Sequence, residues 1–160
     1  MAIVIKPMET DAEIRGKAFV HWKCWQEVYP GLVSQAYLDS LTLEKCEEIA
    51  FRWPDNILVA KDADRVVGFV GYGGHAPEEP DMGEVFALYV LPEYHGQGVG
   101  RQLMDAALEK LAAYPNICLW AVKGNGRAVR FYEKCGFRLT GEEVYKQSVS
   151  AYGIRMLMER

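Results

Sequence analysis

The feature that most constrains the fold is a glycine-dense turn at residues 91–101, which reads Leu-Pro-Glu-Tyr-His-Gly-Gln-Gly-Val-Gly-Arg. It follows residues 84–91, a β-branched and aromatic run that predicts a buried central strand. It precedes residues 99–113, whose apolar positions recur at helical spacing. Glycines let the backbone approach a ligand, and a helix start offers unpaired N–H groups with partial positive charge. This strand–turn–helix unit therefore predicts a cradle for a phosphate or diphosphate.

Two familiar phosphate motifs do not fit this turn. In the dinucleotide fingerprint G-x-G-x-x-G, counted from Gly96, Arg101 stands where the third glycine belongs, and no acidic residue lies about 20 residues further on. The P-loop needs Gly-Lys followed by Ser or Thr, whereas Arg101 and Gln102 follow Gly100. A connector without a ligand remains an alternative. Arg101 in the first helical turn opposes the helix dipole, so it favours an anion nearby.

Composition narrows the class of protein. A chain of 160 residues suits a single domain over residues 1–160, and its net charge of −4 gives no basic surface for nucleic acid. The four cysteines contain no CxxC pair and only three histidines accompany them, so we expect no metal site and a reducing, cytoplasmic location. No apolar run approaches about 18 residues, so no membrane association is expected.

The remaining pattern predicts an α+β (mixed α/β) domain of three layers. We expect strands at residues 2–6, 57–61, 65–72, 84–91, 117–122, 137–145 and 152–158, and helices at 11–29, 34–52, 99–113 and 127–135. Asp11 and Ser34 are the expected N-caps of the first two helices. Residues 75–83, with two prolines and three acidic side chains, are expected to form a polar loop.

The glycine turn resembles motif A of the GNAT superfamily of acetyltransferases, whose core is [Q/R]-x-x-G-x-[G/A]. The matching stretch is 95–100, with His95 where the family usually has Arg or Gln. Residues 125–137, Asn-Gly-Arg-Ala-Val-Arg-Phe-Tyr-Glu-Lys-Cys-Gly-Phe, are similar to the family's motif B, N-x-x-A-x-x-[F/L]-Y-x-[K/R]-x-G-F. The resemblance to small bacterial single-domain members implies a three-layer α/β/α domain around a mixed, mostly antiparallel sheet. It also implies an N-acetyltransferase that uses acetyl-CoA as its cosubstrate and needs no metal.

The same resemblance assigns the cofactor contacts. They are Leu88, Tyr89, Val90, His95, Gly96, Gln97, Gly98, Val99, Gly100, Arg101, Asn125, Arg127 and Ala128. The backbone of residues 88–90 would pair with the pantetheine amides as an added strand does. The basic residues around both motifs give this acidic protein local cations for the phosphates of coenzyme A; they are Arg101, Lys123, Arg127, Arg130 and Lys134.

Two catalytic residues follow from the resemblance. Tyr132 would protonate the departing thiolate, because a phenol with a reference pKa of about 10 starts protonated at neutral pH. Its alternative is a core aromatic on an amphipathic helix. Glu84 would take the proton of an ammonium acceptor, directly or through water, and its alternative is an exposed carboxylate at a strand end. Direct attack of the amine in a ternary complex needs no covalent intermediate.

The acceptor is the least constrained part of the prediction. The resemblance places Trp22, Trp25 and Tyr29 at the acceptor groove, although core packing explains the two tryptophans equally well. The acidic residues 78–84 suit a small cationic amine such as a polyamine, or a peptide N-terminus. The alternatives are a binding module or sensor for acyl-CoA without turnover, transfer of another acyl group, and a nucleotide-binding enzyme, which the failed fingerprints disfavour. A homodimer is implied by the resemblance alone.

Overall fold

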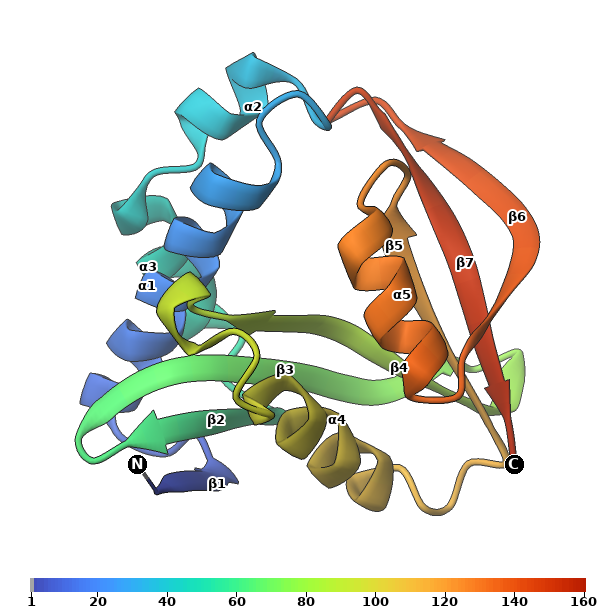
Figure 1. Cartoon of the computed structure of the whole chain (residues 1–160), viewed down its shortest axis with the longest axis horizontal. Helices are drawn as coiled ribbons and strands as arrows, with labels where there is room; N and C mark the ends of the chain where they lie inside the picture. Colours follow the sequence, from blue (N-terminus) through green and yellow to red (C-terminus); the bar gives the residue numbers. More distant parts are fainter. Residues whose placement is uncertain (1) are drawn as a thin grey trace.

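The structure is a computed structural model that describes residues 2–160, and its centre is one seven-stranded sheet (Figure 1). The strands are β1 (Ile3–Pro7), β2 (Ile57–Asp62), β3 (Arg65–Ala76), β4 (Glu79–Val90), β5 (Asn116–Val122), β6 (Arg138–Lys146) and β7 (Ala151–Glu159). Their order in the sheet is β1-β2-β3-β4-β5-β7-β6. Every neighbouring pair is antiparallel except β4 and β5, which are parallel. The predicted mixed, mostly antiparallel sheet is confirmed.

Helices cover both faces of this sheet. They are α1 (Asp11–Val28), α2 (Gln35–Ser40), α3 (Leu43–Arg52), α4 (Val99–Lys110) and α5 (Gly126–Lys134), with a short 3-10 helix η1 (Pro92–Tyr94). Lys17 of α1 lies over the ring of Phe69, with Nζ 4.8 Å from the ring centroid. A Cβ added at Gly68 would instead lie 3.1 Å from Leu103 of α4. Because successive strand residues point to opposite faces, α1 and α4 lie on opposite sides of the sheet, which gives the three predicted layers.

Two helix starts differ from the sequence prediction. Thr10, not Asp11, is the N-cap of α1: its side chain accepts a hydrogen bond from the Glu13 backbone N–H, and the Glu13 side chain accepts from the Thr10 N–H. This reciprocal capping box outcompetes the single bond that Asp11 could make. Ser34 caps a helix as predicted, but that helix ends at Ser40, because Thr42 caps a second one, α3. The single helix expected over 34–52 is therefore wrong.

The polar loop expected at residues 75–83 is also wrong. β3 continues to Ala76 and β4 begins at Glu79, so only two residues join the strands. Backbone pairing across this hairpin, which includes Ala76 with Glu79, decides the conformation. The acidic side chains are tolerated in a strand because the positions that carry them at the hairpin tip are exposed.

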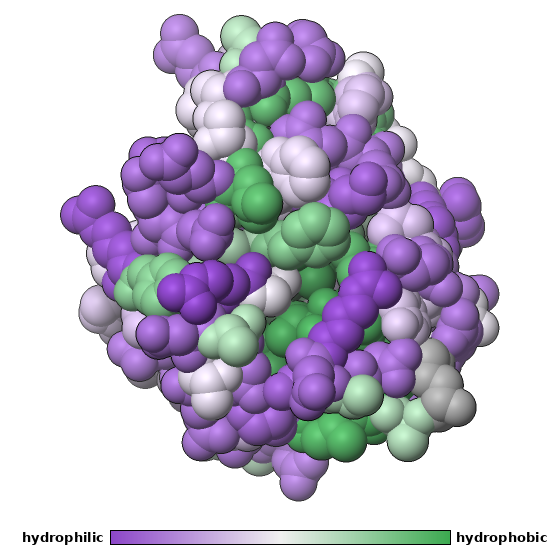
Figure 2. Space-filling view, turned by 90° about the vertical axis from the view of Figure 1, so that its left-hand side faces the viewer, coloured by the Kyte–Doolittle hydropathy of each residue, from purple (hydrophilic) through white to green (hydrophobic). Residues whose placement is uncertain are grey.

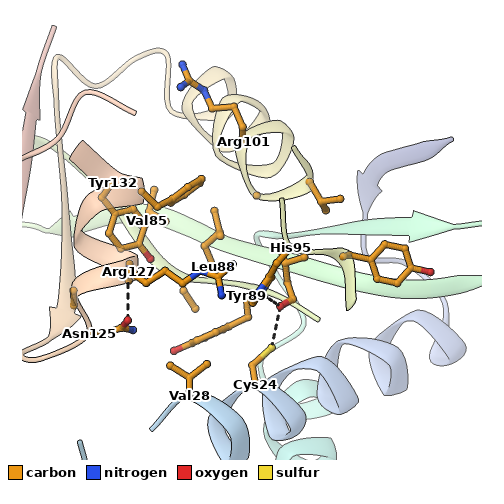
Figure 3. A pocket seen from close by; sticks show the side chains of 18 of the residues that line it. Cys24, Val28, Val85, Leu88, Tyr89, His95, Arg101, Asn125, Arg127 and Tyr132 are labelled. Atoms are coloured by element: carbon orange, nitrogen blue, oxygen red, sulfur yellow. Dashed lines mark hydrogen bonds between the residues drawn. The ribbon is translucent and has the colours of Figure 1, made fainter. Parts of the chain in front are cut away.

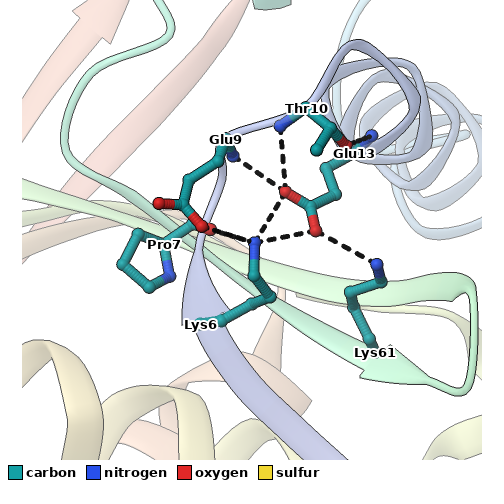
Figure 4. Close-up of polar contacts among 6 residues, drawn as sticks. All are labelled: Lys6, Pro7, Glu9, Thr10, Glu13 and Lys61. Carbon is teal, nitrogen blue, oxygen red and sulfur yellow. Dashed lines mark hydrogen bonds and ion pairs between the residues drawn. The ribbon is translucent and has the colours of Figure 1, made fainter.

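The start of α1 is held to the sheet by a buried carboxylate, that of Glu13 (Figure 4). Glu13 is 3% exposed. Its carboxylate lies 2.7 Å from Nζ of Lys6 on β1 and 3.0 Å from Nζ of Lys61 on β2. It also accepts the backbone N–H groups of Glu9 and Thr10. These charged and backbone donors hold the pKa of Glu13 far below its usual range despite burial. The network fixes the position of the helix whose other end reaches the site described below.

Within residues 2–160, no helix is long and apolar enough to cross a membrane.

Candidate active site

The sheet opens between its two central strands. β4 and β5 pair only where Met82, Gly83 and Glu84 face residues 116–118. Beyond Glu84 the two strands separate. β5 and its sheet neighbours β7 and β6 run in a different direction from β4 (Figure 1). The β5-facing backbone groups in the second half of β4 therefore have no neighbouring strand. They are free to bind a ligand that runs alongside them in extended form.

A β-bulge in β4 lies just beyond this divergence. Gly71 of β3 pairs with Ala87 and Tyr72 pairs with Val85, so Phe86 has no partner residue on β3. A bulge re-aims the backbone and its side chain. Phe86 is consequently 54% exposed, whereas Val85 is 3% exposed. The prediction that residues 84–91 form a well-buried strand holds for Val85, Val90 and Leu91, whereas residues 87–89 are half-buried and Phe86 is exposed.

The glycine turn connects the free end of β4 to α4. Gly96 and Gly98 have φ of 77° and 79°, in the left-handed region that glycine adopts without strain. Gly98 is the N-cap of α4, and no protein atom lies within 4 Å of the position its Cβ would occupy. Within residues 2–160, the N–H groups of Val99, Gly100 and Arg101 have no backbone acceptor. The turn thus presents three unpaired donors at a helix N-terminus, which is the arrangement that binds phosphate.

His95 occupies the position where the family motif has a longer side chain. Its Nε2 lies 2.8 Å from the carbonyl oxygen of Val90, and Cys24 Sγ lies 3.4 Å from the same oxygen. The imidazole therefore ties the turn back to the end of β4 (Figure 3).

A cavity of about 450 Å³ joins the strand divergence to the glycine turn. It is lined by Cys24, Val28, Tyr29, Val85, Phe86, Ala87, Leu88, Tyr89, Val90, Tyr94, His95, Gly96, Gly98, Val99, Gly100, Arg101, Trp120, Ala121, Asn125, Arg127, Ala128, Phe131 and Tyr132. The lining is mostly apolar, with polar groups concentrated at the turn and at the start of α5. On the molecular face seen in Figure 2, hydrophobic side chains gather in a hollow bordered by hydrophilic ones.

The start of α5 forms the wall opposite the glycine turn. The side chain of Asn125 caps this helix by accepting the N–H of Ala128 at 3.3 Å. α5 approaches α4 closely, because a Cβ on Gly100 would lie 3.3 Å from the Phe131 ring. A side chain at the third glycine of the turn would crowd this ring, so Gly100 serves the close approach of the two helices rather than a positive φ.

The basic residues expected near the phosphates have different surroundings. Arg127 lines the cavity, as does Arg101, whose guanidinium also binds Asp105 with Nε and Oδ1 3.1 Å apart. Lys123 instead pairs with Glu143 at 2.9 Å. Arg130 and Lys134 are on α5 but are not among the residues that line the cavity.

Three tyrosines meet at the cavity. Tyr132 projects from α5, and burial raises its pKa well above the ordinary value. Tyr29, at the end of α1, and Tyr89, on β4, place their hydroxyl oxygens 3.1 Å apart. Burial raises the pKa of both, so all three phenols are protonated at neutral pH. Tyr132 can therefore donate a proton.

Most of the predicted site residues come together in this cavity. The exceptions among the described residues are Gln97, whose side chain binds the Glu93 carbonyl, and Trp22, Trp25 and Glu84. The ring centroids of Trp25 and Tyr29 are 4.3 Å apart, so Trp25 supports the Tyr29 ring by packing against it. Trp22 packs on Phe19 at 6.0 Å and contributes to the core.

Glu84 lies at the point of strand divergence, one residue before the cavity lining begins at Val85. Its carboxylate binds Nδ1 of His75 at 2.5 Å, and Cys118 Sγ lies 4.0 Å from it. Sequence reasoning missed His75 and Cys118 because it placed residue 75 in a loop. It also missed Trp120 of β5, which lines the cavity at the other side of the divergence. Only the strand pairing brings these residues together.

Comparison with known proteins agrees with this architecture. A family model described as the acetyltransferase (GNAT) family matches residues 19–137. An uncharacterized N-acetyltransferase of Archaeoglobus fulgidus is 34% identical over 120 residues, covering 69% of this chain and 79% of that protein. An uncharacterized N-acetyltransferase of Bacillus subtilis is 27% identical over 152 residues, covering 90% of this chain and 83% of that protein.

Solved structures share the fold. The PaiA N-acetyltransferase of Thermoplasma acidophilum, crystallised in complex with coenzyme A, superposes with a TM-score of 0.78 at 22% identity over the full length of both chains. A protein of Pyrococcus horikoshii superposes equally well, with a TM-score of 0.78 over 99% of each chain.

Proposed function

Because the chain belongs to the GNAT family of acetyltransferases, and is therefore an acetyl-CoA-dependent acetyltransferase, we propose that it transfers the acetyl group directly to a primary amine in a ternary complex. The observation that carries the proposal is the continuity of the cavity. It runs from the three free N–H groups at the start of α4, along the unpaired half of β4, to the strand divergence. A diphosphate followed by an extended amide chain and a thioester has this same order of groups.

The diphosphate, the pantetheine arm and the thioester of coenzyme A would each have a partner in this arrangement. The N–H groups of Val99, Gly100 and Arg101 would hold the diphosphate, with Arg127 from α5 supplying a cation. The free backbone of residues 87–90 would pair with the pantetheine amides. The thioester would then lie at the bulge, where β4 turns its backbone out of the ladder.

The reaction at the thioester is an acyl substitution. The amine lone pair attacks the carbonyl carbon and a C–N bond forms, after which the C–S bond breaks and its electron pair leaves on sulfur. Tyr132 would give its proton to that sulfur, because burial keeps this phenol protonated at neutral pH, and would regain a proton from the attacking nitrogen, which must lose a second proton to become an amide. Glu84 would accept the proton that the ammonium group loses, directly or through a water molecule. Alignment of the two reactants would supply much of the rate.

The acceptor is proposed to be a small amine that is positively charged in solution. Three carboxylates gather beside the divergence, those of Glu79, Glu84 and Glu142, and the one arginine among them, Arg155, pairs with Glu142 at 3.1 Å. The surplus of negative charge favours a cation. Phe86 and Trp120 offer exposed or cavity-lining aromatic faces that suit its hydrocarbon part.

A thiol-release screen tests the proposal. Purified protein is mixed with acetyl-CoA and, separately, polyamines, aminoglycosides, free amino acids and peptides with free N-termini, with an amine-free blank for hydrolysis. At least one amine should release thiol above the blank and gain the mass of an acetyl group. Initial-rate plots should intersect, because parallel lines would indicate a covalent acetyl-enzyme instead. Tight binding of coenzyme A without transfer to any amine would refute the proposal.

A further inference from the structure

Three side chains form a line from the strand divergence to the protein surface: Glu84, His75 and Glu79. Glu84 Oε1 lies 2.5 Å from His75 Nδ1, and the other ring nitrogen, Nε2, lies 3.1 Å from Glu79 Oε2. The side chains are 14%, 25% and 44% exposed in that order. Glu84 is hydrogen-bonded to His75, His75 lies within ion-pair distance of Glu79, and each group is more accessible to water than the one before it.

The β3–β4 hairpin creates this line. Gly73 pairs with Glu84 and Ala76 pairs with Glu79, and the register shifts between Gly74 and Ala76, where His75 lies. The shift lets one imidazole reach carboxylates that are five residues apart on β4. The two-residue turn holds both strands in place, so the spacing follows from the backbone.

A buried base needs such a connection. If Glu84 accepts a proton from the acceptor amine, it must lose that proton before the next turnover. Its small exposed fraction, and a bound acceptor covering the divergence, limit direct exchange with water. A line of proton-carrying groups removes this restriction because a proton can pass from each group to the next.

We propose that His75 and Glu79 are positioning residues that carry the proton from Glu84 to solvent; this inference rests on the proposed function. After each transfer, the Glu84 carboxyl gives its proton to Nδ1 of His75, which becomes an imidazolium. The imidazolium then gives its Nε2 proton to Glu79, and Glu79 releases it to water. The ring is then neutral with its proton on Nδ1, which faces Glu84; it regains its starting tautomer by turning toward solvent, exchanging that proton with water and turning back. No proton is gained or lost overall, and the chain needs no other reactant.

The groups around His75 fit proton transfer better than metal binding. Glu84, His75 and Cys118 place potential ligand atoms within 4.8 Å of one another. However, the 2.5 Å between Nδ1 and Oε1 is a hydrogen-bond length, whereas two ligands of a tetrahedral metal with bonds of about 2.0 Å would lie about 3.3 Å apart. Arg155 of β7 also lies beside Cys118 and Glu79, and its fixed positive charge opposes a metal cation.

Charged and titratable groups surround His75 from several elements, and Tyr114 lines the same surface pocket as His75. Glu79 and Glu84 come from β4, Cys118 from β5 and Arg155 from β7. Burial raises the pKa of Cys118, so its thiol stays neutral and does not compete for the proton. Arg155 is always charged. The two carboxylates are the groups that lie directly against the two ring nitrogens, which makes them the partners in proton transfer.

The test compares turnover in single and double variants. His75→Ala should lower kcat at neutral pH by about 10- to 100-fold, the scale of a lost general acid–base contribution, and leave the KM for acetyl-CoA within about twofold. Added imidazole should restore part of the rate at fixed pH and ionic strength, and should leave the wild type unchanged. Glu79→Gln should lower kcat by about threefold or more, whereas the matched control Glu78→Gln, the same charge change one residue away in the exposed turn, should not.

A double-mutant cycle distinguishes a relay from a structural role. In a Glu84→Gln background the His75–Glu79 relay receives no proton, so adding His75→Ala should lower kcat by less than about twofold. Additive losses, a defect that imidazole does not relieve, or equal effects of Glu79→Gln and Glu78→Gln would overturn the relay while wild-type transfer still stands. Absence of transfer in the wild type would overturn the proposed function and the relay with it. Glu79 is exposed, so its variant keeps the test valid even if His75→Ala folds poorly.

Discussion

Replacing Gly98 by glutamate should abolish useful binding of coenzyme A. The Cβ position of Gly98 faces open space at the N-terminus of α4, so the new carboxylate would reach the region of the three free N–H groups. At about 5 Å, with an effective dielectric constant of about 20 to 40, two unit charges repel by about 2–3 kcal/mol. A diphosphate in that region would feel at least this much, and about 3 kcal/mol weakens binding roughly 150-fold.

Gly98→Gln is the matched control, because it has nearly the same volume without the charge. Both variants force a side chain onto a φ of 79°, which costs about 1–2 kcal/mol of stability and lowers Tm by about 2–8 °C. That strain is present with and without ligand, so it cancels from the affinity.

Titration calorimetry with coenzyme A at low salt measures the difference. Gly98→Glu should bind coenzyme A at least about 100-fold more weakly than Gly98→Gln, and this difference in affinity should narrow in high salt. Acetyl-pantetheine, which lacks the diphosphate, should be used equally by both variants. Equal affinity of the Glu and Gln variants for coenzyme A would refute the cradle at residues 96–101.

Four further variants test separate parts of the structure. Tyr132→Phe should lower single-turnover transfer by about 10-fold or more with coenzyme A affinity unchanged, and full activity would assign the proton to another group. Glu84→Gln should be most defective at low pH, where the acceptor is protonated, and should approach the wild type at alkaline pH; a parallel profile would exclude it as base. His21 is held neutral by burial, with its pKa lowered to about 4, so wild-type stability is complete above the unfolded pKa of about 6.5 and is lost as pH falls toward 4. Between pH 7 and pH 4.5 the wild type should lose up to about 3 kcal/mol of its free energy of unfolding from this cause, and His21→Leu should remove that loss. Urea unfolding at the two pH values measures the difference. Glu13→Gln should cost about 3 kcal/mol and 6–12 °C of Tm near pH 7. The pKa of Glu13 is depressed in the fold, so this difference should shrink as pH falls below about 4.5, and a pH-independent gap would contradict the charge-based account.

Local patterns predicted much of this architecture because local physics decides it. The turn at Gly96 and Gly98 needs positive φ, and only glycine meets that need cheaply, so the sequence marks the cradle directly. The N-cap at Ser34 and the end of α5 at Cys135 are likewise set by nearby residues. Several predicted boundaries, such as those of β2, β5 and α4, lie within a few residues of those observed.

Two errors were local, the N-cap of α1 and the helix break before Thr42, and the others arose where distant backbone pairing decides the structure. Residues 75–83 are polar and contain prolines, yet the ladder between β3 and β4 extends through Ala76 and Glu79. The bulge at Phe86 and the parting of β4 from β5 leave no periodic trace in the sequence. The same limitation hid the contacts of His75 with Glu79 and Glu84, since a residue assigned to a loop has no defined neighbours.

The short parallel contact between β4 and β5 has a mechanical consequence. Three residue pairs are all the strand pairing between the four-stranded part of the sheet, β1 to β4, and the three-stranded part, β5 to β7. The free protein should therefore flex there. A pantetheine arm bound along β4 would bridge the two parts of the sheet and restrict this motion. Amide hydrogens of residues 86–90 should then exchange with deuterium more slowly in the presence of coenzyme A. The two parts of the sheet should lose their independent motion only while the cosubstrate is bound.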